Sequence, residues 1–322
     1  MTRRIVYPDA PSSWVALFND ERRSKLNTIG EFSLQVSDRH PEPETLIDRI
    51  GDAEGMISGW GVVNEVLAAL PNLEVISFIG LGAASFFDLA ETARRGITVT
   101  HTLPPGETIA EHTMALMLAA SRKVALRDRE IRQGLWNDLP IFDLRGKTLG
   151  LVGFGRVAQA TVPLAKAFGM NVVAWARSPK AEYASRYGIE FVALEELLAG
   201  SDVISLHLLL NQETEGLLSS KMLRSTKPGV VFVNTAREQL LDETTLIELL
   251  QSGHIGAMAT DVFNKEPLSQ DHPFNELDNV VMTPHNAYNT PEFTAILCDM
   301  AINNLEAYFA GNPKNIATFS EQ

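Results

Sequence analysis

Three side chains suited to anion binding and proton transfer lie in the C-terminal third of the chain, each shortly after a strand-like segment. Arg237 contributes a guanidinium, Glu266 a carboxylate and His285 an imidazole. The strand-like segments before them span residues 230–234, 256–260 and 280–282. In an open sheet of parallel strands, ligands bind at the carboxyl ends of the strands. The sequence therefore predicts that a cation, a carboxylate and an imidazole share one rim of a sheet.

A glycine-rich turn earlier in the chain predicts the binding of a dinucleotide. Residues 153–158 read GFGRVA, follow the strand-like run 148–152 and open a helix-like run. The first glycine permits a tight turn, the second lets backbone N–H groups approach a pyrophosphate, and Ala158 lets the helix pack close to the strand. The start of that helix offers further N–H groups to the anion. The residues expected to contact the cofactor are Gly153, Phe154, Gly155, Arg156 and Val157.

The end of the next strand-like segment, 171–176, indicates which cofactor is preferred. An acidic residue at this position bonds the ribose hydroxyls of NAD and repels the 2′-phosphate of NADP. Here the position holds Ala176, and Arg177, Ser178 and Lys180 follow it. A guanidinium can bind a phosphate through two hydrogen bonds. The sequence thus favours NADP(H), with NAD(H) as the alternative if Arg177 and Lys180 are ordinary solvated side chains.

Strand-like and helix-like segments alternate along the chain and predict two α/β domains. At 322 residues the chain is too long for one ordinary core. With helices as crossovers, the pattern predicts doubly wound parallel sheets. The strand-like segments are residues 5–7, 32–36, 55–58 and 75–79, and then 148–152, 171–176, 203–206, 230–234, 256–260 and 280–282.

Two longer helices are expected, one at each end of the second series of strands. The first spans Thr108 to Leu126 and has a broad apolar surface, which is typical of a core or a subunit interface. The second spans Pro291 to Phe309 and ends before the stop signal GNP at residues 311–313.

Composition narrows the range of partners and compartments. The net charge of −13 argues against nucleic acid and anionic membranes as partners. No apolar run approaches the ~20 residues that span a bilayer, and no secretory signal is recognised. Cys298 is the single cysteine, so an internal disulfide is excluded, no metal site is indicated, and a reducing cytoplasm is the expected location.

Together the motifs resemble those of the D-isomer-specific 2-hydroxyacid dehydrogenases, which include D-lactate, D-glycerate, phosphoglycerate and hydroxypyruvate/glyoxylate enzymes. The resemblance covers nearly the whole chain. It is carried by the glycine turn, by SDVISLH at residues 201–207, by VNTAR ending at Arg237, by DVFNKEP around Glu266 and by TPHNA around His285. Several ordered motifs at family spacing are more specific than a glycine turn alone.

This resemblance implies a role for each candidate residue. Arg237 would bind the substrate carboxylate and polarise the carbonyl, His285 would exchange a proton with the keto oxygen, and Glu266 would pair with His285. Backbone N–H groups of Gly80, Leu81 and Gly82 would hold the substrate carboxylate from the other domain. Near the cofactor, Asp261 would bond the nicotinamide amide, Thr235 and Ala236 would line its ring, and His207 would lie close by without titrating. His112 also matches the family, and a structural or hinge role is favoured for it.

The fold implied is a flavodoxin-like substrate domain with an inserted Rossmann NAD(P)-binding domain. The first comprises residues 1–103 and 291–322, and the second residues 104–290. A homodimer through the helix Thr108–Leu126 is expected from the same resemblance. The substrate is not carried over, because Leu209 replaces a usual proline and the loop 82–88 departs from the common pattern. In and near that loop Phe86, Phe87 and Trp60 would line an apolar pocket or pack in the core.

The predicted reaction is hydride transfer between NAD(P)H, preferably NADPH, and a 2-keto acid to give a D-2-hydroxy acid. The acid would resemble glyoxylate or hydroxypyruvate, or carry a bulkier side chain. Two alternatives stay open. Phosphite oxidation uses a similar Arg/Glu/His set, and related chains serve as non-catalytic, NAD(H)-sensing corepressors or scaffolds.

Overall fold

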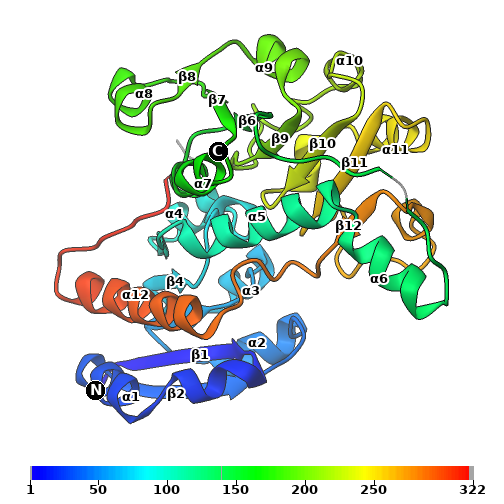
Figure 1. Ribbon diagram of the computed structural model, residues 1–322. Coiled ribbons are helices and arrows are strands. Elements are labelled where there is room, and N and C mark those ends of the chain that lie inside the picture. Colours follow the sequence, from blue (N-terminus) through cyan, green and yellow to red (C-terminus); the bar gives the residue numbers. More distant parts are fainter. Residues whose placement is uncertain (1, 139, 319–322) are drawn as a thin grey trace. The chain divides into compact units, whose positions relative to one another are not determined.

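The chain folds into two α/β units, and the second unit is inserted between the two segments of the first (Figure 1). The computed structural model describes residues 2–138 and 140–318. Unit 1 comprises Met1–Pro104 and Asn289–Gln322, and unit 2 comprises Pro105–Tyr288. The boundaries drawn from the sequence, at 103/104 and 290/291, lie one and two residues from these.

Unit 1 is built on five parallel strands in the order β2-β1-β3-β4-β5. This is the flavodoxin-like order, in which the winding reverses between β1 and β3. All four residues of β4 are buried, because helices cover both faces of a doubly wound sheet. The strands are β1 (Arg4–Ala10), β2 (Glu31–Val36), β3 (Gly55–Ser58), β4 (Val75–Phe78) and β5 (Thr98–His101). The helices are η1 (Ser12–Leu17), α1 (Asp20–Ile29), α2 (Pro43–Ile50), α3 (Asn64–Ala68), η2 (Ala83–Ser85), α4 (Leu89–Arg94) and α12 (Pro291–Phe309).

The C-terminal helix α12 belongs to unit 1, although it follows unit 2 in the sequence. Its start is capped by Thr290, whose side chain accepts the N–H of Phe293, and Pro291 occupies the first turn. Its buried face packs against β4, and the Ser77 hydroxyl donates to the carbonyl of Ala301 at 2.9 Å. The helix therefore covers one face of the sheet, and its bounds match the predicted span Pro291–Phe309.

Unit 2 is built on seven parallel strands in the order β12-β11-β10-β9-β6-β7-β8. Counted from β6, this is the Rossmann order with one strand added, and the winding reverses between β6 and β9. The predicted fold class, two doubly wound parallel sheets, is confirmed. The strands are β6 (Thr148–Val152), β7 (Asn171–Trp175), β8 (Glu190–Phe191), β9 (Val203–Leu206), β10 (Val230–Asn234), β11 (Ile255–Thr260) and β12 (Val280–Met282). The helices are α5 (Glu107–Ser121), α6 (Val124–Arg132), α7 (Arg156–Ala167), α8 (Ala181–Tyr187), α9 (Leu194–Gly200), α10 (Ser220–Arg224), η3 (Glu238–Leu240), α11 (Glu243–Gln251) and η4 (Pro273–Glu276).

Two strands of the structure, β5 and β8, are not predicted from the sequence pattern. β5 reads TVTH, and its polar residues Thr100 and His101 are buried, so no apolar run marks it. β8 has only two residues and pairs with β7 at the edge of the sheet. A short strand at an edge contributes too few apolar side chains to produce a recognisable period.

The prediction of a single long helix over Thr108–Leu126 is wrong. The structure has α5 ending at Ser121 and a separate helix, α6, beginning at Val124. Lys123 between them has a backbone φ of 52°, the left-handed conformation, which ends a helix. No glycine or proline marks this break, and the apolar residues Val124 and Leu126 continue the pattern across it. The apolar face of α5 is buried within unit 2, against α7, β10 and β11.

Candidate active site

The glycine turn joins β6 to α7 with the geometry that a pyrophosphate requires. Gly153 has a φ of 93°, and a Cβ there would lie 2.7 Å from the carbonyl oxygen of His207, so only glycine fits. A Cβ at Gly155 would meet no atom within 4 Å, so the turn faces open space. No side chain caps α7 at Gly155, which leaves the N–H groups of its first turn for an anion. The residues present therefore fit a dinucleotide.

The side chains around this turn divide between core and surface. Ala158 is fully buried, in a core cluster that also contains Leu149 and Leu151 of β6, so the position requires a small residue. Phe154 also turns inward and packs on Tyr187, with ring centroids 5.5 Å apart. Only the backbone of Phe154 is thus offered to a cofactor, whereas Arg156 and Val157 lie in the first turn of α7.

The rim beyond β7 holds two cations and no carboxylate of its own, as the sequence indicated. β7 ends at Trp175, and Ala176 and Arg177 follow it. The Arg177 guanidinium forms an ion pair with Glu213, a residue that sequence reasoning missed. Lys180 lies over the ring of Tyr183, with its Nζ 5.3 Å from the centroid. No local pattern pairs Arg177 with Glu213, because 36 residues separate them.

His207 follows β9 and lies against the glycine turn, close to Gly153. Its Nε2 and the hydroxyl of Ser205 are 2.9 Å apart. Burial lowers the pKa of His207 to about 3, so the ring stays neutral at physiological pH.

The loop after β10 presents Arg237, and the side chain of Asn234 shapes that loop. The Asn234 amide accepts the N–H of Ala236 at 2.9 Å and donates to the carbonyl of Arg237 at 3.0 Å. Thr235 is tied to α5, because its hydroxyl lies 3.0 Å from that of Thr113. Burial lowers the pKa of Arg237 and the charge of Glu266 opposes this, which leaves a guanidinium in a partly desolvated position. A desolvated guanidinium binds a carboxylate more strongly than one in water.

Glu266 and His285 form the expected pair. Nδ1 of His285 lies 2.7 Å from the Glu266 carboxylate, which also accepts the N–H of Phe263 at 3.0 Å. Burial acts against ionisation of Glu266, but the hydrogen bond and charge of His285, the N–H of Phe263 and the charge of Arg237 together lower the pKa of Glu266. The pair leaves Nε2 of His285 for a substrate. Tyr288, whose ring centroid lies 6.3 Å from that of His285, was not singled out from the sequence.

Asp261 holds the loop that carries His285. His285 has a φ of 50°, a conformation that non-glycine residues adopt only when their surroundings impose it. The Asp261 carboxylate accepts the N–H of Asn286 at 3.0 Å and of Ala287 at 2.9 Å, and the hydroxyl of Thr283 at 2.6 Å. Because Asp261 is buried and bonded on both oxygens, its contacts here are with the loop; its role at the nicotinamide stays a prediction.

His112 extends this network to α5. Its Nε2 lies 3.0 Å from the Thr283 hydroxyl and 3.6 Å from Asp261. Since the Thr283 hydroxyl donates to Asp261, the His112 Nε2 must be the donor to Thr283. His112 is thereby placed among structural contacts of unit 2, in keeping with the role favoured from the sequence.

In unit 1, the turn after β4 carries Gly80, Leu81 and Gly82. Gly82 has a φ of 70°, and the carbonyl of Gly80 accepts the Thr102 N–H at 3.0 Å. A Cβ at Gly80 would lie 2.8 Å from the Phe78 ring, so a larger residue there would require that ring to move. The turn is thus joined to the segment after β5, and its binding of a substrate carboxylate stays a prediction.

The aromatic residues near that turn have different environments. Phe87 is in the core, 3% exposed, and Phe86 packs on Phe78 with ring centroids 4.7 Å apart. Trp60 is 37% exposed and meets His40 edge-on. Buried Asp9 accepts the N–H of Trp60 at 3.2 Å, and burial raises the pKa of Asp9 to about 6. Of the three aromatic residues considered for a pocket, Phe87 packs in the core.

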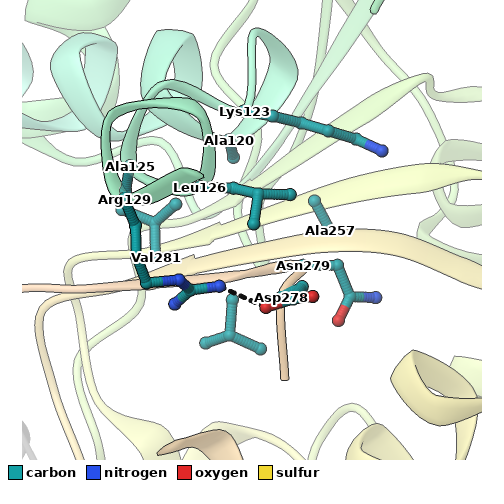
Figure 2. Close-up of a pocket in the computed structure, with 10 residues that line it drawn as sticks. Ala120, Lys123, Ala125, Leu126, Arg129, Ala257, Asp278, Asn279 and Val281 are labelled. Atoms are coloured by element: carbon teal, nitrogen blue, oxygen red, sulfur yellow. Dashed lines mark hydrogen bonds and ion pairs between the residues drawn. The ribbon is translucent and has the colours of Figure 1, made fainter. Parts of the chain in front are cut away.

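A small cavity elsewhere in unit 2 is too narrow for a substrate. Figure 2 shows it between α6 and the strands β11 and β12, beside the ion pair of Arg129 with Asp278. Its volume of about 30 Å³ has room for one or two water molecules. Among residues 2–138 and 140–318, no helix is long and apolar enough to cross a membrane, and no group of three or more His, Cys, Asp or Glu residues could hold a metal ion.

A Rossmann sheet with a glycine turn that fits a pyrophosphate defines a dinucleotide-binding protein, and comparison with known proteins identifies the family. Residues 114–287 match the model of the D-isomer specific 2-hydroxyacid dehydrogenase NAD binding domain. A glyoxylate reductase of Korarchaeum cryptofilum is 34% identical over 305 residues, 91% of each chain. The chain belongs to the D-isomer specific 2-hydroxyacid dehydrogenase family, and it is an NAD(P)-dependent oxidoreductase acting on 2-hydroxy or 2-keto acids.

Two further relatives show the range of the family. A D-3-phosphoglycerate dehydrogenase of Archaeoglobus fulgidus is 40% identical over 255 residues, 77% of this chain but only 48% of the relative. The chain therefore spans about half the length of that enzyme. An acyclic imino acid reductase, solved in complex with NADPH and D-Arg, is 30% identical with a TM-score of 0.84, covering 98% of this chain and all of the other.

Proposed function

We propose that this enzyme reduces a 2-keto acid to the D-2-hydroxy acid and draws the hydride preferably from NADPH. The observation that carries the proposal is the His285–Glu266 contact of 2.7 Å, on the same rim as Arg237. The bound nicotinamide supplies the hydride. Unit 2 would bind this cofactor, and the turn Gly80–Gly82 of unit 1 would contribute to substrate binding.

Each residue of the set has a chemical task in this reaction. Nε2 of His285 donates a proton to the keto oxygen as negative charge develops there, and takes it back in the oxidative direction. Glu266 stabilises the protonated imidazole and fixes its orientation through Nδ1. Arg237 binds the substrate carboxylate through two hydrogen bonds and draws electron density from the adjacent carbonyl.

The preference for NADPH rests on the rim beyond β7. No acid ends this strand, and Arg177 and Lys180 follow it. A structural relative binds NADPH. Glyoxylate reductases among the relatives support a small 2-keto acid such as glyoxylate. Because the loop 82–88 departs from the common family pattern, hydroxypyruvate and bulkier acids stay alternatives.

Assay with both cofactors and a panel of acids tests the proposal. We expect the highest kcat/KM with a 2-keto acid and NADPH, and a D-configured product. The panel contains glyoxylate, hydroxypyruvate, pyruvate and larger keto acids, with and without an added amine, because one relative reduces imino acids. Phosphite with NADP or NAD is included as the competing reaction. A clear preference for NADH would contradict the cofactor proposal, and turnover of phosphite alone would contradict the substrate class.

A homodimer in the cytoplasm is the expected form of the enzyme. None of the nine residues of α6 is buried. On α6 the apolar side chain of Ile131 is 55% exposed, and just beyond the helix Leu135 and Trp136 are 48% and 87% exposed. Apolar side chains that gather on one segment are typical of a protein interface. We therefore assign the contact to this segment, whereas the apolar face of α5 expected from the sequence is used inside unit 2.

Sedimentation should give the mass of two chains, and Trp136→Ser should shift the equilibrium toward the monomer. An aromatic residue at the centre of an interface typically contributes about 2 kcal/mol or more, equivalent to roughly 30-fold in Kd. Phe168→Ser is the matched control, because Phe168 is an exposed aromatic residue elsewhere in unit 2. A monomer for the unmodified enzyme would overturn the expected dimer.

A further inference from the structure

We propose that Glu213 is a specificity-determining residue: it competes with the 2′-phosphate of NADP for Arg177, so the Arg177–Glu213 pair sets the preference between NADPH and NADH. The inference rests on the proposed function in one respect, namely that Arg177 lies at the adenosine ribose. It adds an acidic residue that opposes NADPH binding at the same rim.

Two segments of unit 2 reach this point. Arg177 is the second residue beyond β7, where the Rossmann fold holds the ribose 2′ position. Glu213 lies in the loop after β9, the strand on the other side of β6 from β7. In many Rossmann domains an acidic residue at the end of the second strand lies at the ribose. Here the loop after β9 supplies a carboxylate to that position, through Glu213.

The loop presents Glu213 on a backbone that is tightly held. The side-chain oxygen of Asn211 accepts the N–H groups of Glu213 and Thr214, each at 3.0 Å. The Thr214 hydroxyl in turn accepts the Asn211 N–H at 2.8 Å and donates to the Leu209 carbonyl at 2.6 Å. Because this turn fixes the backbone of Glu213, its side chain stays within reach of the same position when the Arg177 side chain changes partner.

The ion pair itself is weak enough to be exchanged. The side chains of Arg177 and Glu213 are 68% and 63% exposed, and ion pairs at that exposure contribute little to stability. A phosphate monoester carries about two negative charges and three acceptor oxygens, so it can displace a single carboxylate from a guanidinium.

The Arg177–Glu213 pair has opposite effects on the binding of NADH and of NADPH. With NADH, the Glu213 carboxylate can accept a hydrogen bond from a ribose hydroxyl while Arg177 balances its charge. With NADPH, the phosphate must take Arg177 from Glu213 and then lie beside an unpaired carboxylate. Lys180 adds a second cation to the rim, so removal of the Glu213 charge raises the local charge of the three side chains from +1 to +2. The carboxylate therefore favours NADH and limits the preference for NADPH.

Glu213→Gln tests the inference, with Glu215→Gln as its control. Glu215 is exposed, lies in the same loop and forms no ion pair with Arg177. We expect Glu213→Gln to raise the ratio of kcat/KM for NADPH to that for NADH by about tenfold. Inhibition by 2′,5′-ADP should strengthen relative to that by 5′-ADP in the same variant, and the effect should shrink at high salt. In an Arg177→Gln background, Glu213→Gln should have much less effect on the ratio.

The outcomes separate this inference from the proposed function. An unchanged ratio in Glu213→Gln, or an equal rise in Glu215→Gln, overturns the role of Glu213 and leaves the NADPH preference standing. If the unmodified enzyme prefers NADH and Glu213→Gln still raises the ratio, the proposed preference fails and the role of Glu213 is supported. Enzyme concentration by active-site titration and unchanged far-UV circular dichroism show that each variant is folded.

Discussion

Replacing His285 with alanine should lower kcat about 10²- to 10⁴-fold while the dissociation constant of NADPH changes little. A positioned acid–base group contributes a factor of this size, because without it the proton must come from water as charge develops on the keto oxygen. The contacts proposed for the pyrophosphate and the adenosine ribose lie at the glycine turn and beyond β7, in other loops than His285. Single-turnover kinetics and a fluorescence titration with NADPH measure the two quantities separately.

The backbone conformation of His285 calls for a second variant. Its φ of 50° is strained for alanine, so His285→Ala can distort the loop as well as remove the imidazole. Asparagine tolerates the left-handed conformation better, and His285→Asn should show the same loss of kcat. His272, which lies 3.2 Å from Glu243, is a control histidine–glutamate pair in the same unit; His272→Asn should affect stability rather than kcat. Turnover that survives in His285→Asn would exclude His285 as the proton donor.

The stability of the enzyme should fall as pH rises from about 4.5 to about 8, and Glu238→Gln should remove much of that slope. Glu238 is fully buried directly after Arg237. Its Oε1 has no hydrogen-bond partner among the described residues, and its Oε2 accepts only a long bond of 3.4 Å from Asn234. Burial, together with the charge of Glu243, raises the pKa of Glu238 from 4.5 to about 8.

The sign follows from proton binding. Between pH 4.5 and 8 the folded enzyme holds a proton on Glu238 that the unfolded chain has released, so each rise in pH favours unfolding. The slope is at most about 1.4 kcal/mol per pH unit. A glutamine has no charge to lose; its amide can cost about 1–3 kcal/mol if it is left unpaired. Glu238→Gln should therefore be less stable than the unmodified enzyme near pH 5 and more stable near pH 8.

Urea unfolding at pH 5, 6.5 and 8 measures this difference in slope. Glu248→Gln is a suitable control, because Glu248 is half-exposed and pairs with Arg224 at the surface. Parallel pH profiles for the enzyme and Glu238→Gln would show that Glu238 is ionised in the folded state throughout. A steep slope in both would place the titrating group elsewhere, with Asp9 as the next buried acid to replace.

Much of the architecture could be predicted from local sequence patterns. The bounds of β6, β9 and β10 match those of the apolar runs, because strands covered on both faces must be continuously apolar. The glycine turn is equally local, since Gly153 needs a positive φ and a near approach to a neighbouring strand end. The local pattern does not predict β5, because two of its buried residues are polar. It also does not predict the helix break at Lys123, because no glycine or proline marks it.

For the candidate site, the sequence by itself determined which chemical groups follow the strands: Arg237, Glu266 and His285. Their motifs also determined the family. Only the tertiary structure decided which groups meet. It paired Arg177 with Glu213, buried Glu238 with one oxygen unpartnered, and tied the His285 loop to Asp261. The physical reason is that local sequence determines where a strand forms and which residues follow it. Contacts between loops depend instead on the order of the strands in the sheet and on the path of each loop beyond its strand.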